Sequence, residues 1–291
     1  MSISTLGLRL KRISLEWYGL AFLTVFTLVA ILGYGVFALN PQLIPDTDSA
    51  RRFFGQSFTL FARLHIVLTG LVLAIPLLRR AGFQWVPALL AIFLVSFLSE
   101  FLGTGYGFPF GKYEYTALLG YKLGGRVPAL IPLSWFLMAL PSWILARRLV
   151  SRSAFWGRIF LGAYFLTAWD LALDPAMSYL TPYWVWESTG PFYGMPWVNL
   201  LGWMGTGVVL MWILEVLDVS RWSRRITVSW AMAYYLVVLM MPLGMVVAAG
   251  LWWALVATVL AQVVPWGAYL LAKKMAEPAF SATPLGEQVN P

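Results

Sequence analysis

Three carboxylic acids stand inside apolar segments of this chain, where an ionisable side chain is costly and is a functional candidate by default. Asp170 and Asp174 occur in the segment AWDLALDP, and Glu100 occurs in SFLSEFLGTGYG. A helix would place both aspartates on one face, because they are four residues apart, and Pro175 is expected to end or kink that helix. Two carboxyls this close in an apolar setting do not both ionise easily. One of them is therefore expected to keep a proton near neutral pH and to act as a general acid.

Further polar residues lie near the same ends of the apolar segments. Arg63 and His65 open one segment; Arg63 is a candidate counter-ion for a carboxylate, and His65 is either an interfacial hydrogen-bond donor or a catalytic group. Glu187 stands in an aromatic loop, where it is either a solvated loop residue or a second acid. Asn199 begins a later apolar segment and is expected to form hydrogen bonds.

The residue types exclude several chemistries. The chain has no Cys and one His, which excludes disulfides, thiol nucleophiles, Fe–S clusters and multi-histidine metal sites. It has no phosphate-binding or dinucleotide-binding glycine motif, so no metal site and no cofactor are expected. Carboxylic acids beside aromatic rings remain. They suit protonation of an alkene, with the aromatic faces stabilising a tertiary carbocation and a second carboxylate holding water.

The composition places these residues in a membrane protein. The chain has 291 residues, of which 60% are apolar and only 11% charged, with a mean hydropathy of +0.77. Soluble domains carry about 25% charged residues, so an ordinary cytosolic enzyme, a disordered chain and a nucleic-acid binder are excluded. The net charge of +8 comes from short Lys and Arg clusters between long apolar runs, which is typical of membrane topology.

The apolar runs predict an all-α, polytopic membrane helical bundle with about eight transmembrane helices. The expected spans are 17–39, 60–78, 85–103, 129–146, 155–174, 198–217, 228–247 and 251–271. The last two come from one stretch, 226–271, with the turn expected at Pro242 or Gly250. Most of the 20 Lys and Arg residues fall in loops that would be inside if both termini were inside, which favours an N-in/C-in arrangement in the plasma membrane. Residues 1–275 are expected to form one membrane domain and residues 276–291 a disordered tail.

Two loops on the carboxyl-bearing side are long and rich in Gly, Pro and aromatic residues: 104–128 and 175–197. They are either an aromatic belt at the membrane interface or a lid that forms a cavity wall. A faint tandem repeat follows them. Pro128 with Leu133-Ser134-Trp135 matches Pro196 with Leu201-Gly202-Trp203 at an offset of 68 residues.

Several long motifs carry a resemblance to a known family. GTGYGFPFGKYEYT (103–116), VPALIPLSWFLM (127–138), TAWDLALDPAM (167–177) and GPFYGMPWVNLLGW (190–203) resemble the CruF-type membrane carotenoid biosynthesis proteins, over roughly residues 60–270. That family implies a carotenoid 1,2-hydratase without a redox cofactor. Its substrate would be a lycopene-like or γ-carotene-like carotenoid with an acyclic end group, taken from the bilayer, and its product a tertiary alcohol. Other carotenoid-pathway enzymes are expected partners, beside membrane lipid and water.

The residue roles within this resemblance are inferences. Asp174 or Asp170 is expected to donate the proton, with the other aspartate tuning it, and Glu100 to position or deprotonate the water. Tyr113, Trp169 and Trp186 are expected to shield the cation, with Asn199 beside the substrate.

Two other functions stay open. A UbiA-type prenyltransferase would use an Asp-rich motif with Mg²⁺, but the sequence has one such motif and the family uses two. A transporter or a pigment-binding membrane protein would use the carboxyls as a proton relay or as ligands.

Overall fold

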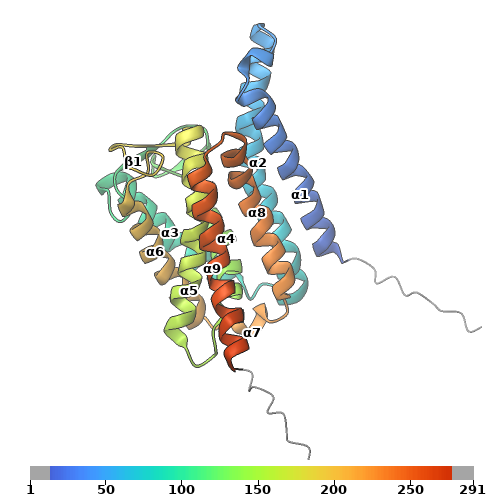
Figure 1. Cartoon of the computed structure of the whole chain (residues 1–291), viewed down its shortest axis with the longest axis vertical. Coiled ribbons are helices and arrows are strands. Elements are labelled where there is room, and N and C mark those ends of the chain that lie inside the picture. Colours follow the sequence, from blue (N-terminus) through green and yellow to red (C-terminus); the bar gives the residue numbers. More distant parts are fainter. Residues whose placement is uncertain (1–13, 277–291) are drawn as a thin grey trace, which may run out of the picture.

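The computed structural model describes residues 14–276, and most of them are helical (Figure 1). The helices are α1 (Leu15–Gly33), α2 (Asp48–Ala81), α3 (Val86–Tyr106), α4 (Leu130–Leu149), α5 (Phe155–Asp174), α6 (Trp197–Val216), α7 (Ser220–Ser223), α8 (Val228–Ala248) and α9 (Trp252–Ala276). Short π or 3₁₀ turns are η1 (Tyr34–Ala38), η2 (Pro41–Leu43) and η3 (Pro175–Leu180). The strands are β1 (Tyr113–Tyr115), β2 (Lys122–Leu123), β3 (Val127–Pro128) and β4 (Trp184–Trp186). The expected disordered tail, apart from Ala276, lies outside the described residues.

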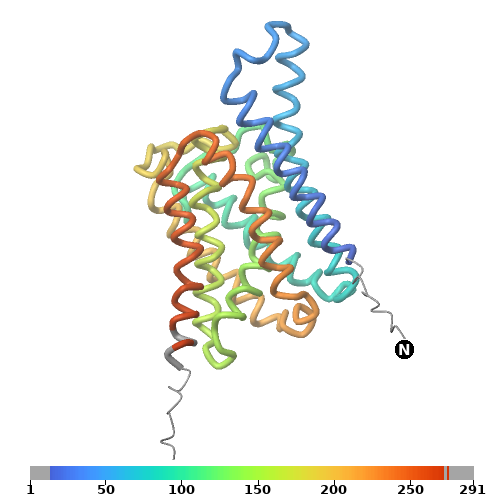
Figure 2. The backbone as a smooth tube through the Cα atoms, turned by 45° about the vertical axis from the view of Figure 1, so that its right-hand side comes forward, coloured from blue at the N-terminus to red at the C-terminus, as the bar shows by residue number. Residues whose placement is uncertain are grey.

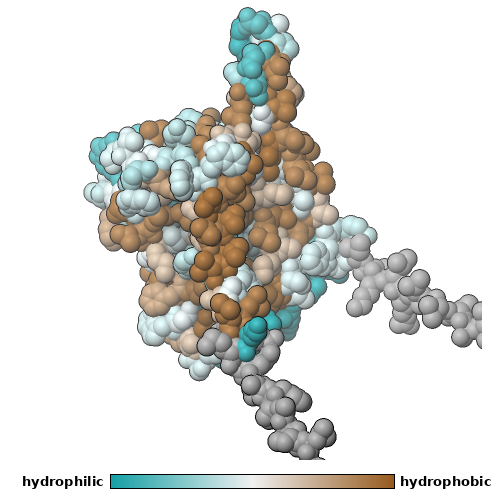
Figure 3. Space-filling model, in the orientation of Figure 1, coloured by the Kyte–Doolittle hydropathy of each residue, from teal (hydrophilic) through white to brown (hydrophobic). Residues whose placement is uncertain are grey.

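Seven of the described helical segments are long and apolar enough to cross a membrane. The remaining predicted span, 155–174, corresponds to α5. This helix of 20 residues falls outside the set of seven and carries Arg158, Asp170 and Asp174. The chain is therefore an all-α, multi-pass membrane bundle, as its apolar runs predicted. Figure 3 shows apolar side chains over the flank formed by α9, and hydrophilic side chains at the tip of the α1–α2 hairpin.

Local signals set several helix boundaries. Thr47 caps α2 by accepting a hydrogen bond from the Ala50 amide, and α3 ends at Gly107, which has the left-handed backbone that favours glycine. The turn between α8 and α9 falls at Gly250, with φ +71°. Pro242 lies inside α8, so its prediction as a turn was wrong. A proline can stay inside a membrane helix where neighbouring helices satisfy the freed backbone groups.

The α1–α2 hairpin projects beyond the rest of the bundle (Figure 2). Helix α2 has 34 residues and begins at Asp48, well before the predicted start at residue 60. At 1.5 Å per residue it is about 51 Å long, which exceeds the ~30 Å hydrocarbon core of a bilayer. Arg51 pairs with Asp48 at 2.9 Å near the tip, so this charged end is built to face water.

Helices α4 and α5 form the centre of the bundle. Helix α4 packs against α3, α5, α8 and α2, and 72% of its most apolar stretch is buried. Helix α5 packs against α4, α6, α8 and α9. Its polar residues are thereby shielded from lipid, which explains how a segment with three charged residues can lie within the bundle.

The two aromatic loops meet at one end of the bundle. Strands β1 and β4 pair antiparallel, with Tyr113 opposite Trp186 and Tyr115 opposite Trp184. Because side chains alternate along a strand, Tyr113, Tyr115 and Trp184 are buried beneath the pair, whereas Glu114 is exposed above it. Residues of both loops line the cavity described below, which agrees with the cavity-wall alternative of the sequence analysis.

The tandem repeat corresponds to a structural repeat. Each half has a helix, a loop with one strand of the β1–β4 pair, and a second helix: α3, β1 and α4 in the first half, where the loop also holds β2 and β3, and α5, β4 and α6 in the second. The two strands pair with each other, and the matched residues Trp135 and Trp203 stack with ring centroids 4.1 Å apart. The two halves therefore face each other around one site.

Candidate active site

A cavity lies beneath the β1–β4 pair. Its wall is mostly apolar and aromatic, with residues from α2, α3, α4, α5, α6 and α8 and from both loops. The predicted site residues that line it are Glu100, Tyr113, Trp169, Asp170, Asp174, Trp186, Asn199 and His65. The structure thus gathers around one cavity residues that are up to 134 positions apart in the sequence.

Asp174 is held entirely by neutral donors. Its Oδ1 accepts hydrogen bonds from Trp184 Nε1 at 3.1 Å, from Trp186 Nε1 at 3.3 Å and from the hydroxyl of Ser178. Its Oδ2 accepts from Asn199 Nδ2 at 3.1 Å. Four donors thus fix the position of this fully buried carboxyl and occupy both of its oxygens.

Asp170 has a different environment. Its Oδ2 accepts from the same Asn199 Nδ2 at 2.8 Å, so one amide group bridges both aspartates. Its Oδ1 is buried and has no hydrogen-bond partner among the described residues. Asp170 therefore differs from Asp174 in having one oxygen without a hydrogen-bond donor among the described residues.

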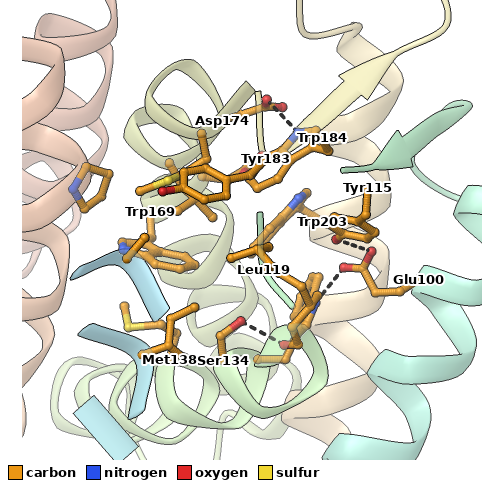
Figure 4. A pocket seen from close by; sticks show the side chains of 18 of the residues that line it. Glu100, Tyr115, Leu119, Ser134, Met138, Trp169, Asp174, Tyr183, Trp184 and Trp203 are labelled. Atoms are coloured by element: carbon orange, nitrogen blue, oxygen red, sulfur yellow. Dashed lines mark hydrogen bonds between the residues drawn. The ribbon is translucent and has the colours of Figure 1, made fainter. Parts of the chain in front are cut away.

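Glu100 stands across the cavity from this pair. Its Oε1 accepts from Trp135 Nε1 at 2.8 Å, and its Oε2 accepts from Tyr115 Oη at 2.8 Å and from Tyr113 Oη. Burial and the neighbouring Glu100 carboxylate raise the pKa of both tyrosines well above the ordinary value, so their hydroxyls remain donors. Figure 4 shows the Asp174–Trp184 bond at the top of the cavity and the Glu100–Tyr115 bond at its right.

Side chains of each lid strand donate hydrogen bonds to the carboxyl of the helix that precedes the strand. Tyr113 and Tyr115 of β1 donate to Glu100 of α3, and Trp184 and Trp186 of β4 donate to Asp174 of α5. Pairing of the strands places both sets of donors side by side. The lid therefore fixes the position of the carboxyls as well as covering them.

Three of the accessory predictions can be compared with the structure. Arg63 donates to the carbonyl oxygens of Leu118 at 2.7 Å and Ala117 at 3.1 Å. Across residues 14–276, no ion pair joins it to a carboxylate, so the counter-ion interpretation was wrong and Arg63 supports the lid loop instead. Glu187 is exposed, pairs with Lys112 at 3.1 Å and does not line the cavity, which contradicts its interpretation as a second acid.

The single histidine lines the cavity wall nearest α1. His65 is buried, and its Nε2 lies 3.1 Å from Thr27 Oγ1. This contact agrees with the hydrogen-bonding alternative of the sequence analysis. In the described part of the chain, no group of three or more His, Asp or Glu side chains is arranged to hold a metal ion.

Sequence reasoning missed part of the aromatic wall. Tyr115, Trp135, Trp184 and Trp203 line the cavity, and the first three donate hydrogen bonds to its carboxyls. Two signals could have found them. Tyr115 and Trp184 share an alternating pattern with the predicted Tyr113 and Trp186, and the other two occupy the matched position of the repeat.

Comparison with known proteins gives two findings. The model of a family described as "Carotenoid biosynthesis protein" matches residues 61–265. A bisanhydrobacterioruberin hydratase from Haloarcula japonica is 32% identical over 176 residues, which cover 60% of this chain. The chain spans 57% of the length of that relative. No solved structure matches the chain significantly.

Proposed function

The chain belongs to the carotenoid biosynthesis protein family, and from this premise we propose that it is a carotenoid hydratase. It adds water to the terminal C1=C2 double bond of an acyclic end group, on a lycopene-like or γ-carotene-like carotenoid, in the plasma membrane. Membership of the family and similarity to a hydratase support the reaction class. The three buried carboxyls in an aromatic cavity support the chemistry.

The unpartnered Oδ1 of Asp170 carries the assignment of the acid. In Asp174 and in Glu100, both carboxyl oxygens accept hydrogen bonds. The donors are Trp, Ser and Asn groups at Asp174, and Trp and Tyr groups at Glu100. Asp170 alone of the three has an oxygen that no protein donor occupies. A proton on that Oδ1 has no protein acceptor and is available to the substrate. Asp170 is therefore the proton donor, and Asp174 keeps it protonated by its own charge.

The aromatic wall stabilises the charge that protonation creates. Transfer of the Asp170 proton to C2 turns the double bond into a tertiary cation at C1. Trp169 lines the cavity directly beside Asp170, and Trp203 packs edge-on against Trp169 with centroids 6.0 Å apart. The negative faces of such rings attract a cation, and the attraction is strongest where water is excluded.

Water completes the reaction. Its oxygen attacks C1, and its extra proton passes to a carboxylate of the cavity, either directly to Asp170 or by way of Glu100. Asp170 is then protonated again, so the sum is alkene plus water to tertiary alcohol. Glu100 is suited to hold this water, because its position is fixed by three donors that leave acceptor capacity on Oε1.

The test is expression of the chain in a bacterial host that makes an acyclic carotene, with pigment analysis by mass spectrometry in oxygen-18-labelled water. A product heavier by one labelled water, with the label in a tertiary hydroxyl, is expected. Unchanged pigment, in cells that hold the folded protein in the membrane, would contradict the proposal. A prenylated product that requires Mg²⁺, or uptake of unchanged pigment, would identify the two alternative functions instead.

A further inference from the structure

A second cavity, which is open on one side, lies between the projecting α1–α2 hairpin and the bundle. Aromatic residues of the hairpin dominate its wall: Tyr34, Phe37, Phe53, Phe54, Phe58 and Phe61. The opposite wall comes from η3 and α8. No charged residue of the described chain lines this cavity, so its occupant must be apolar.

The second cavity adjoins the active-site cavity, and the two share part of one wall. Ala62, Met177, Tyr183 and Met241 line both cavities. Only these residues are common to the two linings, so they mark the place where a long apolar molecule would pass from one cavity to the other.

The four residues of the shared wall differ in how easily they can move. The Tyr183 amide donates to Met177 O at 2.9 Å, and its carbonyl accepts from the Thr116 amide at 2.9 Å, so both lid loops hold its backbone. Met177 and Met241 carry unbranched thioether side chains, which adapt easily to a changing neighbour. Ala62 contributes only a methyl group on the α2 side. This construction suits a passage that a narrow chain can thread.

We propose that the second cavity binds the distal part of the substrate, a long linear hydrocarbon chain whose end group lies at Asp170. The proposal rests on the hydratase function and extends it to substrate length. The wall shared with the acid-bearing cavity, the aromatic lining and the lack of charge favour this occupant over a lipid headgroup or a polar peptide. The α1–α2 hairpin is then a substrate-binding element, and its length beyond the bundle serves the length of the chain.

Glycine 33 offers a direct test. Gly33 lines the second cavity, and a Cβ added there meets no atom within 4 Å, so Gly33→Phe can place a side chain at the cavity wall with no clash at its Cβ. Gly55 provides the matched control: it lies on α2 in the same hairpin, a Cβ there also meets nothing within 4 Å, and it lines neither cavity. Both variants receive the same side chain in a helix.

Two measurements are made on full-length protein in detergent or vesicles. Hydration is followed with a full-length acyclic carotene and with a short acyclic isoprenoid hydrocarbon that has the same end group. Binding of the carotene is followed separately by quenching of tryptophan fluorescence. Gly33→Phe is expected to lower both binding and hydration of the long chain by about tenfold or more. Hydration of the short chain by Gly33→Phe, and both activities of Gly55→Phe, are expected to match the wild type.

The outcomes separate this inference from the function on which it rests. Long-chain binding by Gly33→Phe equal to that of the wild type would overturn the inference, even if hydration is established. Wild-type protein that binds the carotene through the second cavity but does not hydrate it would overturn the hydratase proposal and support the binding site. An equal loss with long and short chains would also overturn the inference, because it would indicate a general disturbance of the active site.

Discussion

The two ends of the bundle treat buried carboxylates in opposite ways. At the end that holds α7, Glu215 pairs with Arg147 and with Arg158, each at 3.0 Å, and Glu16 pairs with Arg80 at 3.1 Å. At the lid end, Glu100, Asp170 and Asp174 have only neutral Tyr, Trp, Ser and Asn donors. The difference separates carboxylates that secure the fold from carboxyls that can exchange a proton.

The physical reason lies in the partner. An arginine keeps its charge at every accessible pH, so a carboxylate paired with it stays ionised. Neutral donors stabilise an anion less, and two neighbouring carboxyls oppose each other's ionisation. A proton at the lid end can therefore be given up and recovered during a reaction, whereas protonation of Glu215 would leave two arginines without their partner.

Replacement of Asp170 tests this comparison most severely. Asp170→Asn keeps the size of the side chain and its contact with Asn199 but removes the acid. Hydration of an acyclic carotene is expected to fall by about 10²–10⁴-fold, the usual contribution of a general acid. Product formation is measured in vesicles that contain equal amounts of folded protein.

Asp174→Asn is the matched variant for the assignment. It removes the neighbouring charge while leaving Asp170 in place, so a smaller loss is expected, together with a change in the pH dependence of the rate. Full hydration activity in both variants would show that neither aspartate is the acid.

The opposite end is expected to show the reverse result. Glu215→Gln leaves Arg158 buried, with its charge compensated only by the carbonyl oxygens of Ser151 and Arg152. Removal of one partner from a buried ion pair lowers the free energy of unfolding by about 3–5 kcal/mol. Chemical unfolding in detergent measures this loss. Hydration per folded molecule should stay at the wild-type level, and a selective loss of hydration would break the distinction between the two ends.

A single lid donor should have a smaller effect. Tyr115→Phe removes one hydrogen bond to Glu100 and leaves those from Tyr113 and Trp135. A hydrogen bond to a charged group contributes about 1.5–3 kcal/mol, so hydration is expected to fall by roughly ten- to a hundredfold. Steady-state rates on the carotene measure the loss. Tyr121→Phe, at an exposed hydroxyl of the same loop, is the control and should be neutral.

The sequence predicted which carboxyls lie around one cavity better than it predicted the contacts that hold them. Asp170, Asp174 and Glu100 could be identified because a carboxyl in an apolar helix is rare enough to indicate a role without any knowledge of its neighbours. Their common cavity followed from the alternation of spans, which brings the ends of α3 and α5 to the same side of the bundle. The family resemblance was confirmed by the match to residues 61–265.

The contacts that the sequence did not predict are long-range ones. Arg63 could have reached several carbonyl or carboxylate oxygens, and only the path of the loop at Ala117 and Leu118 determines which. Likewise, hydropathy did not predict that α2 extends beyond the bundle, because the first turns of this 34-residue helix are too polar for a membrane span. The capping residue Thr47 is the local signal for the true start of the helix. Such a capping signal predicts the polar extension of a helix only if helix starts are sought independently of the apolar span.

The lid surface should give the smallest effect. Glu187 and Lys112 form an ion pair at 3.1 Å in which both side chains are more than half exposed, at 61% and 54%. Exposed pairs contribute about 0.2–1 kcal/mol, and neither residue of this pair lines the active-site cavity, so Glu187→Gln should leave hydration and stability close to wild type. The rate at low and high salt measures it directly. A large loss of activity at both salt concentrations would mean that charge on the lid surface matters to the reaction. Neutral donors within the cavity and ion pairs outside it would then no longer distinguish the carboxyls proposed to react from the others.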